Sequence, residues 1–202
     1  MTRTIFADQL SPAMKVVLNA QSVGLTPEQF VRLCGDNPEL RIELTAQKEI
    51  IIMSPTGSKT GWRCAEILRQ LANWAKQDGT GLAFDSNTGF ILPNGAERSP
   101  DASWIRRERW DALTPEQQEV FAPICPDFVV ELRSPSDTLT ELQEQLEEYI
   151  ANGTQLGFLI DPFDRRVYVC RPNRPAECFD QPVSVTGAPQ LSGFDLHLTE
   201  LW

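Results

Sequence analysis

The sequence contains a single histidine, His197, and this scarcity excludes most histidine-based chemistry. A Ser-His-Asp triad or a zinc site with several histidines would have to be built on that one residue. His197 lies in the segment GFDLHLTELW, where apolar and polar residues alternate as they do in a surface strand. We therefore expect His197 to be an ordinary exposed side chain.

Paired cysteines are also absent. The five cysteines are spread widely and include no CxxC pair. An odd number at such spacing argues against a zinc cluster and against a disulfide framework. We expect reduced thiols buried in the core.

Long apolar runs are missing as well. No segment approaches the roughly 20 apolar residues that span a bilayer, and residues 1–24 lack the continuous apolar core of a signal peptide. We expect a cytoplasmic protein that does not enter a membrane.

Positive charge is scarce, because 18 lysines and arginines face 28 acids and the formal net charge is -10. This balance counts against a broad electropositive surface, which is the usual footprint of a nucleic-acid-binding protein. Local basic clusters remain, and solvated surface is the simpler interpretation of both: Arg63, Arg69 and Lys76 on one predicted helix, and Arg106, Arg107 and Arg109 after a predicted strand.

The chain of 202 residues is long enough for one domain with a real core. Apolar runs predict strands over 40–44, 49–53, 82–85, 88–92, 102–105, 128–132, 155–160 and 166–170. Helical patterns occupy 26–34 and 58–77, and a third helix capped by Ser136 and Asp137 ends near Asn152. This alternation predicts an α/β fold, a mixed β-sheet flanked by helices. We expect residues 1–25 to be an N-terminal lead-in and residues 26–202 to be a single domain.

Two acids stand in or beside runs that indicate buried strands: Asp101 in SPDASWI and Glu131 in PDFVVELRSPSD. A buried carboxylate is costly unless something compensates its charge, and a shared divalent cation does so. Magnesium keeps several of its waters, so two or three protein oxygens suffice to hold it for phosphodiester hydrolysis. In the structural alternatives Asp101 is a turn residue, and Glu131 is paired with Arg133 or a neighbouring arginine.

Pro100-Asp101 followed by Glu131-Leu132-Arg133 resembles the PD-(D/E)XK motif. From about Thr26 to Trp202, the segments RIELTAQKEIIIMSPTG, SPDASWI, PDFVVELRSPSD, LEEYIANGTQLGFLIDP and LSGFDLHLTELW resemble, in this order, the Uma-type family of restriction-endonuclease-like proteins. The resemblance implies a restriction-endonuclease-like core and a Mg²⁺-dependent endonuclease acting on DNA, with Mn²⁺ as a substitute ion. It places the metal ligands on Glu43, Asp101 and Glu131, and a phosphate contact on Arg133. A surface strand position is the alternative for Glu43.

The chain departs from the family pattern at its basic positions. Arg133 replaces the final lysine of the motif; arginine can clamp a phosphate but stays protonated and cannot act as a base. Many relatives carry a lysine on the following helix, where this chain has Gln145. Lys59 stands where relatives often have an acid, and we expect it to face solvent. These departures favour an alternative function, a catalytically impaired module that binds nucleic acid or a protein partner, and a structural ion-pair network is a third interpretation. A homodimer would suit cleavage of both strands of a duplex.

Overall fold

A computed structural model describes residues 15–202, and residues 1–14 of the expected lead-in lie outside the described part. From Lys15 onward the lead-in forms strand β1 (Lys15–Asn19) and a 3-10 turn, η2 (Gln21–Val23). β1 pairs antiparallel with β3 (Glu49–Met53), with Lys15 opposite Met53 and Asn19 opposite Glu49. The division of the chain at residue 26 stays a prediction.

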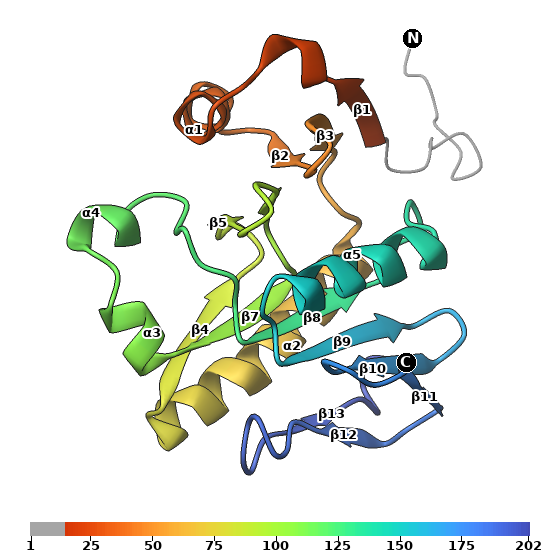
Figure 1. Ribbon diagram of the computed structural model, residues 1–202. Helices are drawn as coiled ribbons and strands as arrows, with labels where there is room; N and C mark the ends of the chain where they lie inside the picture. The colour runs from red at the N-terminus through yellow and green to blue at the C-terminus, as the bar shows by residue number, and fades with distance from the viewer. Residues whose placement is uncertain (1–14) are drawn as a thin grey trace, which may run out of the picture.

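The first sheet has five strands in the order β1-β3-β2-β6-β5. It adds β2 (Arg41–Leu44), β5 (Phe90–Ile91) and β6 (Glu97–Arg98), and every pairing is antiparallel. Helix α1 (Pro27–Asp36) packs Phe30 against Ile42 and Leu44 of this sheet. α1 begins with the predicted Thr26 cap and continues two residues beyond the predicted end at Cys34. Together α1 and β1–β3 form the upper layer in Figure 1.

The second sheet has six strands in the order β11-β10-β9-β8-β7-β4. Its strands are β4 (Gly81–Asp85), β7 (Ala102–Arg106), β8 (Phe128–Leu132), β9 (Leu156–Asp161), β10 (Arg166–Cys170) and β11 (Glu177–Asp180). β8 and β9 run parallel, joined through helix α5 (Leu139–Ala151), while the other pairs are antiparallel. The predicted mixed sheet is therefore confirmed.

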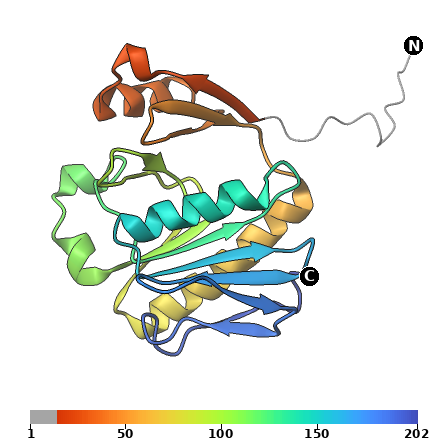
Figure 2. The same cartoon turned by 45° about the vertical axis from the view of Figure 1, so that its right-hand side comes forward.

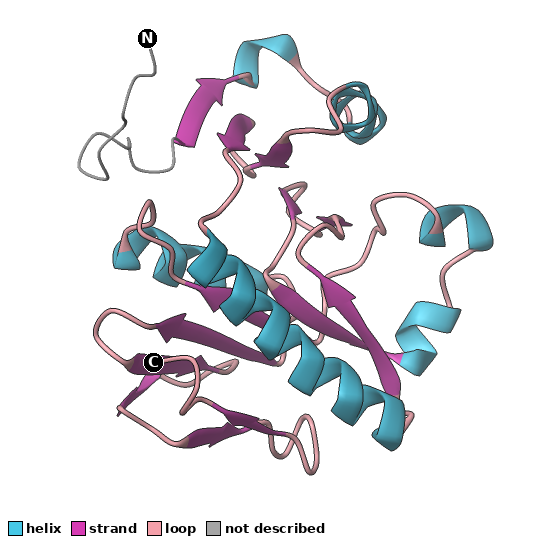
Figure 3. Ribbon diagram, turned by 180° about the vertical axis from the view of Figure 1, so that it is seen from behind, coloured by secondary structure: helices cyan, strands magenta, loops and turns pink. Residues whose placement is uncertain are grey.

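Helices cover both faces of the second sheet. α5 lies in front of it in Figure 2, and α2 (Ser58–Asp78) crosses the opposite face in Figure 3. Successive side chains of a strand point to opposite faces. Phe128 and Val130 of β8 accordingly join the core beneath α2, and Val129 joins the core beneath α5. The same alternation turns Glu131 toward α5.

The remaining elements are α3 (Arg107–Asp111), α4 (Pro115–Gln118), β12 (Ser184–Thr186) and β13 (Asp195–His197). His197 is exposed on β13, as predicted. The predicted cap of α5 is wrong: Thr138 caps the helix, because Ser136 and Asp137 are used in a turn where Asp137 Oδ2 accepts the Ser134 N–H at 2.9 Å.

All five cysteines are free. Cys125 is buried as expected, whereas Cys34, Cys64 and Cys170 are partly exposed and Cys178 is exposed on β11. In the part of the chain that the structure describes, no helix is long and apolar enough to cross a membrane.

Candidate metal centre

A cleft of about 1040 Å³ lies between residues of the first sheet, the start of α2, the end of β8 and α5. Its lining includes all three acids that the sequence singled out, Glu43, Asp101 and Glu131. Arg41 and Gln145 also line it. Strands from both sheets therefore bring the predicted ligands to one cleft.

Asp101 and Glu131 meet because of the register between β7 and β8. Ala102 lies opposite Val130 and Ser103 opposite Val129 in this antiparallel pair. One residue beyond the ladder, the same register sets Asp101 opposite Glu131. Residues directly opposite each other on one face of such a pair are close neighbours. Two acids that are thirty residues apart in the chain thus face the same end of the sheet.

Glu131 is buried, with 4% of its surface exposed. Gln145 on α5 donates a hydrogen bond from Nε2 to Glu131 Oε1 at 3.0 Å. Burial raises the pKa of Glu131 well above its ordinary value, and the neighbouring charges of Asp101 and Glu43 raise it further. The hydroxyl of Tyr149, one turn further along α5, is buried close to this pair without a hydrogen bond of normal geometry to any described residue.

Asp101 is held just before β7 by the neighbouring strand. Its Oδ2 accepts the backbone N–H of Leu132 at 2.9 Å, and its Oδ1 lies 3.4 Å from Nη1 of Arg41. Burial raises the pKa of Asp101, although Arg41 and the Leu132 N–H favour the charged form and limit the rise. The hydrogen bond from Leu132 restricts the rotation of this carboxylate, which suits a ligand.

Glu43 is buried, not a surface glutamate, and both its oxygens are engaged. Oε2 lies 3.1 Å from Nη1 of Arg98, and Oε1 accepts the backbone N–H of Ser99 at 3.2 Å. Arg98 also forms an ion pair with Glu148 of α5, with 2.6 Å between Nη2 and Oε2. Glu43 thereby belongs to a buried ion-pair network that links the first sheet to α5.

Arg41 is a site residue that the sequence interpretation missed. It precedes Glu43 by two positions on β2, and residues at this spacing share one face of a strand. Burial alone would lower the pKa of Arg41, but the charges of Asp101, Glu43 and Glu131 raise it above its ordinary value. The R-x-E spacing on a predicted strand was the signal that could have found it.

Two other predicted basic residues lie elsewhere. Arg133 Nη1 forms an ion pair with the buried Asp161 at 2.7 Å, its guanidinium lies over the ring of Phe163, and it does not line the cleft. Lys59 is exposed, as expected. A phosphate contact from Arg133 stays a prediction. To make that contact, the guanidinium would compete with its ion pair to Asp161.

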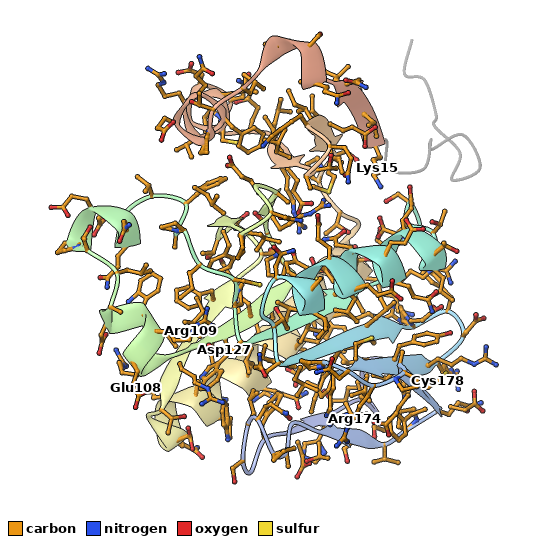
Figure 4. All side chains as sticks on the ribbon, viewed as in Figure 1. Lys15, Glu108, Arg109, Asp127, Arg174 and Cys178 are labelled. Carbon is orange, nitrogen blue, oxygen red and sulfur yellow. The ribbon has the colours of Figure 1, made fainter. Side chains whose placement is uncertain are left out.

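The local basic clusters are largely paired or buried. Arg109 lies beside Asp127 (Figure 4) at 3.0 Å, and Arg106 lies 3.7 Å from the same carboxylate. Arg63 is buried and donates to the Leu201 carbonyl oxygen at 2.6 Å, whereas solvated surface was expected. Near the cleft, Lys15 of β1 reaches Glu141 at the start of α5 at 3.3 Å (Figure 4). None of these contacts forms a broad basic surface.

The donors at the cleft fit a hard divalent cation with many waters. Carboxylate oxygens are the ligands that magnesium prefers, and two of them satisfy an ion that keeps most of its hydration shell. Within residues 15–202, no three His, Cys, Asp or Glu side chains are grouped so that they could hold a metal ion. Asp101 and Glu131 are therefore the fitting pair, since Glu43 is bound to Arg98 and Ser99. The repulsion that raises the pKa of Glu131 is what a cation would relieve.

The cleft does not support thiol chemistry. Cys34 and Cys64 line it, but burial, together with the charge of Glu97, raises the pKa of Cys34 to about 11, and burial, together with the charge of Asp101, raises that of Cys64 to about 12. A thiol at such a pKa is protonated at neutral pH and is a poor nucleophile.

A mixed sheet with helices on both faces and paired acids at a strand end is consistent with a restriction-endonuclease-like fold. The chain belongs to the Uma2 family, described as "putative restriction endonuclease", whose model matches residues 27–199. It is similar to a solved structure from Anabaena variabilis, described as a "putative nuclease belonging to DUF820", with 26% sequence identity and a TM-score of 0.71. That similarity covers 88% of this chain and 97% of the other. None of the curated proteins matches the chain. The predicted family and fold class are confirmed.

Proposed function

We propose that the protein is a metal-dependent endonuclease that hydrolyses phosphodiester bonds in DNA, with Asp101 and Glu131 holding Mg²⁺ and Glu43 supporting them from β2. Proteins of the restriction-endonuclease-like class generally depend on divalent metals, and Mn²⁺ would serve as a substitute. The observation that carries the proposal is the register that sets Asp101 opposite Glu131. Both acids line one cleft of about 1040 Å³ that is open to ligand.

Each protein group has a part in this reaction. Mg²⁺, when bound, supplies neutralisation of phosphate charge and a polarised water. The Leu132 N–H orients Asp101, and the Gln145 amide orients Glu131. Arg41 carries positive charge beside both acids but stays protonated, so it cannot accept a proton from water. Preorganised carboxylates of this kind reduce the reorganisation needed when charge develops on the phosphate.

A second candidate is a nuclease-fold module that binds nucleic acid or a protein partner without cutting. The hydrogen bond from Gln145 to Glu131 favours it, because an uncharged amide stands where many relatives carry a lysine. Binding that persists without turnover in saturating Mn²⁺ would identify this function. Affinity that falls steeply with salt would indicate a phosphate backbone as the ligand.

The test is cleavage of supercoiled plasmid in Mg²⁺ or Mn²⁺ by the wild type and by Asp101→Asn and Glu131→Gln. Both substitutions keep side-chain volume and remove the charge. We expect the rate of each variant to fall at least 100-fold, about the loss for removal of one stabilising group at a reaction centre. Asp180→Asn is the matched control, because Asp180 lies exposed on β11, away from the cleft.

Equal cutting by wild type, D101N and E131Q would refute the metal centre. Chelation by EDTA should abolish cleavage and added Mn²⁺ should restore it. We also propose a cytoplasmic homodimer, which would suit cleavage of both strands. Light scattering of the active fraction tests the oligomeric state.

A further inference from the structure

Arg41 is the basic side chain beside the proposed metal ligands, and its contacts with the acids are long. Its Nη1 lies 3.4 Å from Asp101 Oδ1 and its Nη2 lies 4.0 Å from Glu43 Oε1. Well-formed charge-assisted hydrogen bonds measure about 2.7 to 2.9 Å. Among residues 15–202, the one short contact of this guanidinium is with a neutral group, the Ser99 carbonyl oxygen, at 2.5 Å from Nη2.

Arg98, in the same network, is held more firmly than Arg41. It lies 2.6 Å from Glu148 and 3.1 Å from Glu43, and 8% of its side chain is exposed. The Arg41 side chain is 35% exposed and lines the cleft. The Nε of Arg41 is buried without a hydrogen-bond partner among the described residues. Arg41 is thus close enough to neutralise the acids but not locked to them.

We propose that Arg41 is an exchangeable counterion: it neutralises Asp101 and its neighbours while the centre is free of metal, and a divalent cation displaces it from the same carboxylates. This inference deepens the proposed function and rests on it. The guanidinium has room to turn into the cleft, still tethered at Ser99. There it can meet a phosphate in the bidentate manner that arginine favours. Arg41 then supplies positive charge from β2, while α5 presents only the neutral Gln145 to Glu131.

The test compares Mn²⁺ binding by the wild type and by Arg41→Met, which keeps an unbranched stem and removes the charged guanidinium. Arg166→Met is the matched control, because Arg166 pairs with Asp180 on the exposed edge of the second sheet. Without metal, R41M should melt below the wild type, because the acids lose their counterion. Isothermal titration should show Mn²⁺ binding to R41M about tenfold more tightly than to the wild type, a common size for coupling between two sites. Mn²⁺ should also raise the melting temperature of R41M more than that of the wild type, and R166M should behave as the wild type.

A measurement on the wild type covers the case in which R41M does not fold. In a nitrogen-15 spectrum, Mg²⁺ should shift the Nε–H signal of Arg41 and leave that of Arg98 in place. Equal or weaker Mn²⁺ binding by R41M, or an unmoved Arg41 signal in a wild type that does bind Mg²⁺, would overturn the exchange. No binding of either metal by either protein would instead refute the metal centre itself, and the exchange with it.

Discussion

Glu97 is an acid with 1% of its surface exposed on β6, and both of its carboxylate oxygens lack a hydrogen-bond partner among the described residues. Burial raises the pKa of Glu97 from its ordinary 4.5 to about 7, while Lys48 opposes the rise and Glu28 adds to it. We predict that Glu97→Gln stabilises the fold above neutral pH. The amide has the shape of the protonated acid and never acquires the charge.

The pKa values set the magnitude and the pH window. A pKa difference of about 2.5 corresponds to about 3.4 kcal/mol at 1.36 kcal/mol for each pKa unit, and water that reaches the carboxyl would reduce this to about 2 to 3 kcal/mol. Because the folded-state pKa of Glu97 is raised, the stability that its protonated form contributes to the wild type is fully present below pH 4.5. That contribution is lost as the pH rises through about 7. The variant should keep that stability.

Urea unfolding at pH 5 and pH 9 measures the effect. At pH 9 we expect the free energy of unfolding of E97Q to exceed that of the wild type by about 2 to 3 kcal/mol, or about 4 to 12 °C in melting temperature. At pH 5 the two proteins should differ little. Glu177→Gln on the exposed strand β11 is the control and should leave the pH dependence unchanged. The same slope with pH in wild type and E97Q would refute the reasoning.

Two further predictions concern basic residues. Gln145→Lys places an ammonium beside Glu131 Oε1. In the plasmid-cleavage assay with Mg²⁺ or Mn²⁺, we expect this variant to cut at least tenfold faster than the wild type. A slower or unchanged rate would show that α5 does not need a charge at this position. Arg133→Met leaves the fully buried Asp161 without its ion pair, so the free energy of unfolding should fall by about 3 to 5 kcal/mol in urea denaturation. Loss of cleavage in R133M without this loss of stability would instead support the predicted phosphate contact.

Regular elements could be predicted from the sequence because their signals are local. Thr26 with Pro27 marked the start of α1, and the apolar run at residues 128–132 matched β8. The two-residue strand β6 escaped prediction because so short a segment has no periodicity to detect. Its place in the first sheet depends on pairing with Leu44, far away in the chain.

The predicted acids reach one cleft, but their partners could not be predicted in the same way. The ion pair of Arg133 with Asp161 joins positions 28 residues apart, and Arg41 meets Asp101 over 60 residues. The first contact depends on the parallel pairing of β8 with β9, and the second depends on how the first sheet packs against the second. The resemblance to the motif assigned a phosphate contact to Arg133, which stays a prediction, and Arg41 was overlooked.

The alternating side chains of β8 tie the chemistry of this protein to its folding. Sliding β8 by a single position against β7 would exchange its two buried faces: Phe128 and Val130 would turn toward α5, and Glu131 would turn into the apolar core beneath α2. Core packing alone thus maintains the alignment of the two carboxylates, even in an evolved protein that has lost nuclease activity. A lineage could abandon catalysis and still inherit an intact acidic pair, so the pair's survival in a sequence is weaker evidence of activity than it first suggests.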